Sequence, residues 1–157
     1  MAKLSMMLAV LFAAALLAPR PVAATEQDDV AAKLKAFEGV DHFAAEPDGS
    51  YKGVADPKLH AKLNGMVDSA SASLAAGIRK RKSDPDQMQQ VRWRLWQVNP
   101  KDLDPQDANR VTKEFGQLLS LAGLAQYDRI LIQWLYNYEA HKPKKEVQTL
   151  SDFSAGG

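Results

Sequence analysis

The most continuously apolar stretch after the N-terminal segment runs from residue 127 to residue 140, with the sequence YDRILIQWLYNYEA. Wound at about 3.6 residues per turn, it leaves only a narrow polar stripe formed by Arg129, Gln133 and Asn137. A helix that is apolar over most of its circumference has to be covered by other elements. The pattern therefore predicts an all-α domain whose helices pack around a central C-terminal helix, 127–140.

Four earlier segments repeat apolar residues every three or four positions, as the buried face of a helix requires. They are 25–39, 57–81, 85–98 and 105–122. Each of the last three follows an aspartate and begins with a proline, so the aspartate can cap the helix while the proline takes a position that needs no N–H. Together with 127–140, these segments predict about five helices.

Residues 91–95 also fit a strand, because apolar and polar side chains alternate there. The proline at the start of the segment and the lack of a convincing second strand favour a helix. A lone strand has no partner for its backbone hydrogen bonds.

The helix predicted over 105–122 has a clear division into two faces. Its apolar positions predict a buried stripe that consists of Val111, Phe115, Leu118, Leu119 and Ala122. The side chains predicted to face water are Arg110, Lys113, Glu114 and Gln117.

Residues 1–24 have the pattern of a secretory signal peptide. Lys3 precedes an uncharged apolar run over 8–17, and the small residues 22–24 resemble a cleavage site. An uncleaved membrane anchor is the alternative, but the run is far shorter than the roughly 20 residues that span a bilayer, and Arg20 follows it closely. We therefore expect a bacterial protein exported to the periplasm or secreted, without a stable membrane span after cleavage.

Composition limits the function classes. Removing residues 1–24 leaves 133 of the 157 residues, with 18 basic and 19 acidic side chains. This balance argues against nucleic-acid binding, which needs a surplus of positive charge on one face. The absence of cysteine excludes disulfides, thiolate metal sites and thiol catalysis. The length predicts one helical domain over 25–142, and the aperiodic segment 143–157 predicts a flexible tail.

The sequence contains no pattern typical of an enzyme or a cofactor site. His42, His60 and His141 lie far apart, and no spacing places two metal ligands on one helix face. A nucleophile elbow, a phosphate-binding loop and a dinucleotide fingerprint are all missing from the sequence. We therefore expect no metal and no cofactor.

The candidate interaction surface lies on the helix over 85–98, where Trp93 falls opposite the apolar positions Met88 and Val91. A tryptophan beside arginines and glutamines is typical of surfaces that stack on sugars or anchor a partner protein. The alternative is that another helix covers the ring, because a domain of this size needs its large aromatic residues inside. The candidate partner-binding residues are Trp93, Arg92, Arg94, Trp96, Gln89 and Gln97.

The C-terminal third of the chain resembles an uncharacterised bacterial family of small all-helical domains of unknown function. The resemblance covers mainly residues 105–138, and its motifs are a helix start over 105–110, a helix end over 122–124 and the Trp-Leu-Tyr segment 134–136. It implies an all-helical fold and no known activity, so it transfers no site.

Three functional hypotheses follow from these patterns. The leading one is a non-enzymatic exported protein that binds a periplasmic protein or a glycan through the surface around Trp93. The second is an enzyme that acts on cell-wall glycan or peptide with Asp41, Asp48 and Asp56, which requires a cleft with two acids roughly 5 to 9 Å apart. The third is a periplasmic immunity-type inhibitor, which shares every sequence feature of the first.

Overall fold

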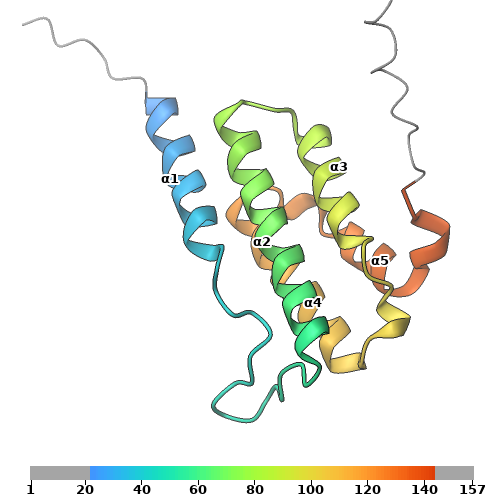
Figure 1. Ribbon diagram of the computed structural model, residues 1–157. Helices are drawn as coiled ribbons and strands as arrows, with labels where there is room; N and C mark the ends of the chain where they lie inside the picture. The colour runs from blue at the N-terminus through green and yellow to red at the C-terminus, as the bar shows by residue number, and fades with distance from the viewer. Residues whose placement is uncertain (1–21, 144–157) are drawn as a thin grey trace, which may run out of the picture.

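Helices make up most of the structure, a computed structural model that describes residues 22–143 (Figure 1). Within this range the elements are α1 (Val22–Phe37), α2 (Pro57–Arg79), α3 (Asp84–Leu95), η1 (Pro100–Asp102), α4 (Pro105–Leu121), η2 (Ala125–Tyr127) and α5 (Arg129–His141), where η denotes a short 3-10 helix. The predicted all-α fold of about five helices is confirmed, including a helix over the ambiguous residues 91–95.

Side-chain caps fix where three of the helices begin. Asp56 before α2 and Asp104 before α4 each accept a hydrogen bond at 2.8 Å from the backbone N–H two residues later, as predicted. The start of α3 differs by one residue, because the hydroxyl of Ser83 is the cap and accepts the N–H of Asp86. Asp84 instead lies in the first turn, where the helix dipole favours its negative charge.

The helices form two layers. In Figure 1, α1, α2 and α3 lie side by side and alternate in direction, and α4 and α5 lie behind them. The two layers meet at α2, which packs against α1, α3 and α4, and at α4, which packs against α1, α2 and α5. The loop over residues 38–56 joins α1 to α2 at the lower end of the molecule in this view.

The outward side of α5 carries exposed apolar residues, which corrects the expectation that this helix is covered on all sides. Its buried residues are Ile130, Leu131, Trp134 and Tyr138. By contrast, 57% of Ile132 and 72% of Tyr136 is exposed. The physical reason is that α5 belongs to the outer layer, and a small domain does not have enough polar residues to form its whole surface.

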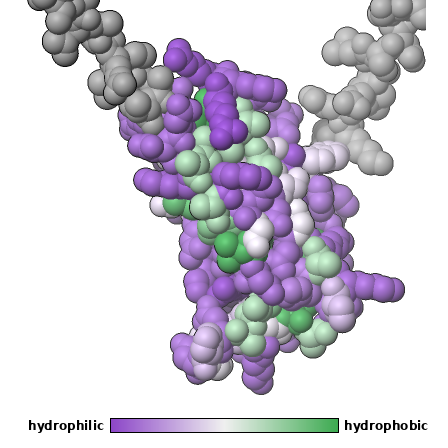
Figure 2. Space-filling view, turned by 60° about the vertical axis from the view of Figure 1, so that its left-hand side comes forward, coloured by the Kyte–Doolittle hydropathy of each residue, from purple (hydrophilic) through white to green (hydrophobic). Residues whose placement is uncertain are grey.

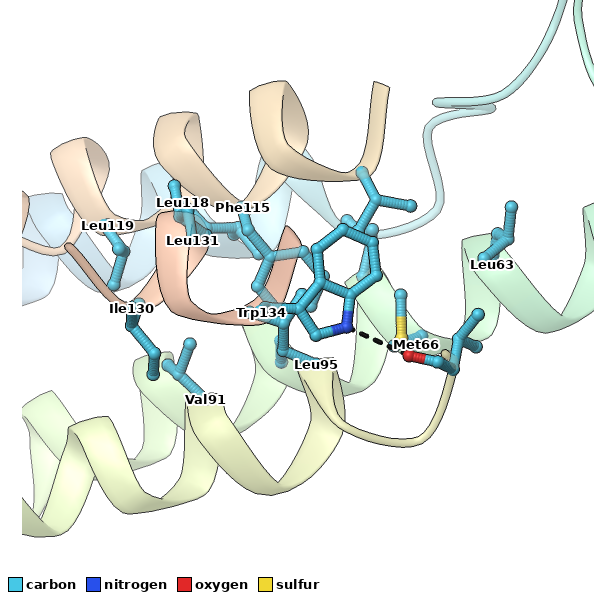
Figure 3. Packing of buried hydrophobic residues seen from close by; sticks show 14 of the residues in the cluster. Leu63, Met66, Val91, Leu95, Phe115, Leu118, Leu119, Ile130, Leu131 and Trp134 are labelled. Atoms are coloured by element: carbon cyan, nitrogen blue, oxygen red, sulfur yellow. Dashed lines mark hydrogen bonds between the residues drawn. The ribbon is translucent and has the colours of Figure 1, made fainter. Parts of the chain in front are cut away.

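The core nevertheless centres on a side chain of α5. Trp134 is fully buried, and its indole N–H donates to the carbonyl of Val98 at 2.9 Å (Figure 3). Three other helices pack side chains around it, and those labelled in Figure 3 are Leu63 and Met66 of α2, Val91 and Leu95 of α3, and Phe115, Leu118 and Leu119 of α4.

The predicted signal peptide and tail lie largely outside the described residues. Residues 22–24 belong to α1, three positions ahead of the predicted start of this helix at residue 25. Cleavage after residue 24 and a flexible segment over 143–157 therefore stay predictions. No helix within residues 22–143 has both the length and the apolar character needed to cross a bilayer.

Candidate functional site

Trp93 lies on the outer side of α3, with 48% of its surface exposed. Gln89 and Gln97, four residues before and after it, are exposed as well. The opposite side of the helix buries Val91 and Leu95 in the core. Trp93, Gln89 and Gln97 are named the Trp93 surface below.

The two other tryptophans of the chain are structural. Trp96 and Trp134 are both buried, and each donates its indole N–H to a backbone carbonyl, that of Tyr138 at 3.0 Å and that of Val98 at 2.9 Å. Within residues 22–143, the indole N–H of Trp93 has no such acceptor. Since a tryptophan with one apolar face and one free donor suits an interface, Trp93 alone has the features of a contact residue.

Three residues predicted for the interaction surface instead fasten α3 to its neighbours. Trp96 stacks on Tyr138 with 6.1 Å between ring centroids, and the hydroxyl of Tyr138 donates back to the carbonyl of Trp96 at 2.8 Å. Arg92 covers the ring of Trp96 at 5.0 Å and donates to the carbonyl of His141. Arg94 donates to the hydroxyl of Ser69 on α2 at 2.8 Å.

A second cluster of polar residues lies under the loop over residues 38–56. His42 and Glu114 are almost completely buried, and His42 Nδ1 lies 2.8 Å from a carboxylate oxygen of Glu114. The other ring nitrogen, Nε2, lies 3.0 Å from the carbonyl oxygen of Phe37. Both neighbours are acceptors, so the doubly protonated imidazolium satisfies both contacts.

Burial favours the neutral form of His42, but the hydrogen bonds to Glu114 and Phe37 outweigh it, so the net effect raises the pKa of His42 above its usual value. The ring also packs on that of Phe37, with centroids 4.2 Å apart. The contacts of His42 inside the fold therefore favour its charged form.

Arg110 fastens the same loop to α4. Its Nε donates to the carbonyl of His42 at 2.8 Å and lies 2.9 Å from Glu114, while its terminal nitrogen pairs with Glu46. The hydrogen bond from Ser50 and the pairing with Arg110 lower the pKa of Glu46 to about 2. These contacts make an ion network of His42, Glu114, Arg110 and Glu46, which we name the loop clamp.

An open groove of about 490 Å³ runs beside the loop clamp, between α1 and α4. Its apolar lining includes Phe37, Val40 and Leu121, and Lys33 and Lys113 lie along it. Figure 2 brings the α1 side of the molecule forward and shows hydrophobic patches enclosed by hydrophilic side chains. Because His42, Arg110 and Glu114 already pair with one another, the polar groups of the groove stabilise the loop more directly than they offer contacts to a ligand.

At Gly53, two parts of the 38–56 loop approach each other closely, and a substitution there tests this approach. Its φ of +75° is a left-handed conformation, and a Cβ there would lie 2.7 Å from the backbone nitrogen of Ala45. Gly49 has a similar φ of +74° but open space around it. We expect Gly53→Ala to lower the free energy of unfolding by about 3 kcal/mol and Gly49→Ala by about 1 kcal/mol. Urea denaturation of both variants checks this, and equal losses would contradict the close approach.

Comparison with known proteins places the chain in a family. The model of a domain of unknown function, DUF4844, matches residues 25–139. The chain belongs to the DUF4844 family. The match covers α2, α3 and α4 completely and most of α1 and α5, and it agrees with the resemblance to a helical family of unknown function seen in the sequence.

The DUF4844 fold is also similar to a solved structure. The crystal structure of a DUF3571 family protein from Acinetobacter baumannii superposes with a TM-score of 0.64 at 27% sequence identity, over 74% of this chain and 95% of that one. A comparison with curated proteins gave no match. These comparisons therefore support the helical architecture, and they name no activity that could be transferred to this chain.

The acids of the enzyme hypothesis have local structural roles in this DUF4844 chain. Asp56 caps α2. The hydrogen bond from Asn64 lowers the pKa of Asp41, and that from the Ser50 backbone lowers the pKa of Asp48. A general acid needs a raised pKa, so these shifts have the wrong direction for acid catalysis.

The buried histidine does not supply a catalytic base either. Both nitrogens of His42 are engaged, by Glu114 and by the Phe37 carbonyl, so neither is free to accept a proton from a substrate. Within residues 22–143, no group of three or more His, Asp or Glu side chains is arranged to hold a metal ion.

Sequence reasoning placed Glu114 and Arg110 in water and gave His42 no partner, so it missed the loop clamp. The sequence did contain a partial indication of the ion pair within α4. Glu114 directly precedes the buried Phe115, and Arg110 precedes Glu114 by one helical turn, a spacing that allows an ion pair. The partner of this pair comes from a loop 72 positions earlier than Glu114, which no local pattern reveals.

Proposed function

We propose that this DUF4844 protein is a non-enzymatic, exported interaction protein that holds a partner through the Trp93 surface. The observation that carries the proposal is the contrast among the three tryptophans. Two are buried with their N–H groups bonded inside the chain, whereas Trp93 is half exposed on an outward helix face. Tryptophan is among the residue types enriched at the positions that dominate binding energy at interfaces.

The flanking side chains suit such a contact. Gln89 extends the Trp93 surface along α3 by about 6 Å, from the rise of 1.5 Å per residue, and Gln97 lies in the turn just after the helix ends at Leu95. Each glutamine offers an amide donor and an acceptor. Below them, Arg92, Trp96 and Arg94 hold α3 to α5 and α2, so the surface is presented on a firmly anchored helix.

The class of partner proposed is a protein. Trp93 lies on the outer face of α3 and lines none of the four grooves found among residues 22–143, whereas small ligands are usually held in concave sites where most of their surface is buried. An outward face with a central aromatic residue and polar neighbours resembles the organisation of protein interfaces.

Affinity capture with matched variants tests the proposal. The chain from residue 25 serves as bait against the periplasmic extract of its own source, beside Trp93→Ala and Val40→Ala. Val40 is equally exposed, at 50%, and lies in the turn after α1. We expect a partner recovered with wild type and Val40→Ala and at least tenfold less with Trp93→Ala. Equal recovery with all three baits would contradict a role for Trp93.

Two alternatives give different results in the same experiment. An immunity-type inhibitor is the case in which the captured protein is a toxin, and purified toxin should then lose its activity on addition of the chain. An enzyme acting on cell-wall glycan or peptide would instead release fragments from purified cell wall, and this activity would be insensitive to Trp93→Ala. Export itself is tested by sequencing the N-terminus of the protein from the periplasmic fraction, which should begin at Thr25.

A further inference from the structure

The groove between α1 and α4 is the largest of the four found among residues 22–143, at about 490 Å³ against about 310 Å³ or less for the others. In Figure 1, α1 is the outermost helix of its layer, with α2 on one side only. A site that holds a small molecule usually has a volume of about 300 to 1,000 Å³. The groove is therefore large enough for a ligand of that class.

The surface of the groove is mainly apolar. Ala36 and Phe37 come from α1, Val40 from the turn after it, and Leu121 from the end of α4. Phe37 and Leu121 are only partly buried, and half of Val40 is exposed. Because water covers this apolar surface in the free protein, an apolar group that displaces the water is favoured there.

The two acidic side chains of the groove already have partners. Glu114 pairs with His42 and Arg110 in the loop clamp. Asp41 lies 2.9 Å from the Nε2 atom of His60 on α2. Both acids are thus engaged in polar contacts within the fold, and neither points to a cationic ligand.

The two lysines of the groove are held much less. Lys33 on α1 is exposed and forms no ion pair within residues 22–143. Lys113 on α4 is mostly exposed, and it lies 3.4 Å from Glu46, a carboxylate that also pairs with Arg110. The charge that remains available to a ligand in the groove is therefore positive.

We propose that this groove binds an aliphatic carboxylate, whose carboxylate pairs with Lys33 and whose chain lies on the apolar lining. Lys113 adds to the positive charge that attracts the ligand. The loop clamp fixes one end of the site in advance, since the ring of His42 packs on that of Phe37 with centroids 4.2 Å apart. The site is independent of the Trp93 surface, which belongs to another helix and is proposed to bind a protein.

Nuclear magnetic resonance titration of the purified ¹⁵N-labelled protein with sodium dodecanoate, below its micelle concentration, tests this inference. We expect saturable shifts of amide signals from residues 33–42 and 113–121. Dodecyltrimethylammonium has the same chain with the opposite charge, and acetate has the head group without the chain. Each should bind at least about tenfold more weakly than dodecanoate, because each lacks one of the two contacts.

Matched variants test the contribution of each part of the groove. Lys33→Glu and Val40→Asp should each weaken dodecanoate binding by at least about tenfold, since each puts a negative charge beside the ligand. Lys58→Glu, at an exposed lysine of α2 outside the groove, is the control and should leave binding unchanged. Circular dichroism checks that the variants keep their helices.

Three results would overturn the proposal. The first is the absence of shifts in the groove up to the micelle concentration of dodecanoate. The second is equally tight binding of dodecyltrimethylammonium, which would show that the lysines do not select the ligand. The third is unchanged binding by Lys33→Glu.

Discussion

Replacing Trp134 with alanine is expected to lower the free energy of unfolding by about 3 to 5 kcal/mol, the range for deleting a fully buried aromatic side chain. The loss combines the apolar surface removed from the core with a cavity among α2, α3 and α4, and it leaves the Val98 carbonyl without its donor. Because small domains are stable by only about 5 to 15 kcal/mol, much of the population should unfold under mild conditions.

Urea denaturation followed by far-ultraviolet circular dichroism measures this loss without relying on tryptophan fluorescence. Trp134→Phe should cost less, since it keeps part of the ring volume and gives up the hydrogen bond. Trp93→Ala is the matched control at an exposed tryptophan, and its midpoint should change little. Similar losses for Trp93→Ala and Trp134→Ala would contradict the assignment of one tryptophan to the surface and the other to the core.

Replacing Glu114 with glutamine is expected to destabilise the protein by about 3 kcal/mol at pH 6 and by clearly less at pH 9. Glu114 pairs with His42 inside the fold, and removing one partner of a buried ion pair leaves the other charge uncompensated. At pH 9 a larger fraction of His42 is neutral, so the loss of the carboxylate costs less. Urea midpoints at the two pH values give the comparison.

The direction of this pH dependence follows from the direction in which folding shifts the pKa of His42. Its pKa is raised in the folded state, against burial, by Glu114 and the Phe37 carbonyl, with the charge of Asp68 acting in the same direction. The stability that the pair contributes is therefore fully present below about pH 6.5, the unfolded value, and is lost as the pH rises through the higher folded value. Wild type should lose stability over that interval, and Glu114→Gln should lose less.

Lys113→Ala is the control for the pH experiment. Lys113 is mostly exposed and lies 3.4 Å from Glu46, at the edge of the loop clamp. Its removal should leave both the urea midpoint and its pH dependence close to those of wild type. A loss for Glu114→Gln that is equal at the two pH values, or larger at pH 9, would show that the folded protein does not depend on a charged His42.

Sequence patterns predicted the helices well because their signals are local. The aspartates before Pro57 and Pro105 cap their helices, as expected, and Gly123 takes a positive φ of 73° just after α4. The sequence predicted that α5 is covered on nearly all sides, and this was wrong. Periodicity shows which residues are apolar, but it does not show how many neighbouring elements are available to cover them. Ile132 and Tyr136 are therefore exposed, although the apolar pattern predicted that other elements would cover them.

The candidate site was predictable only in part. The helical pattern correctly put Trp93 opposite the buried Val91, but it could not foresee that Trp96 would stack on Tyr138, 42 residues later. The same limit applies to the loop clamp. Contacts between residues far apart in sequence depend on how the helices pack, and one sequence carries no direct record of that packing.

Photo-crosslinking at position 93 tests the central claim most directly. A benzophenone amino acid replaces Trp93 in one protein and Val40 in another, both are expressed in the source organism, and the cells are irradiated. We predict one prominent crosslinked protein for the probe at position 93 that the probe at position 40 does not give. Its recovery would identify the partner and establish that α3 contacts it. Identical patterns from the two probes, or no adduct at position 93, would contradict an interaction through the Trp93 surface.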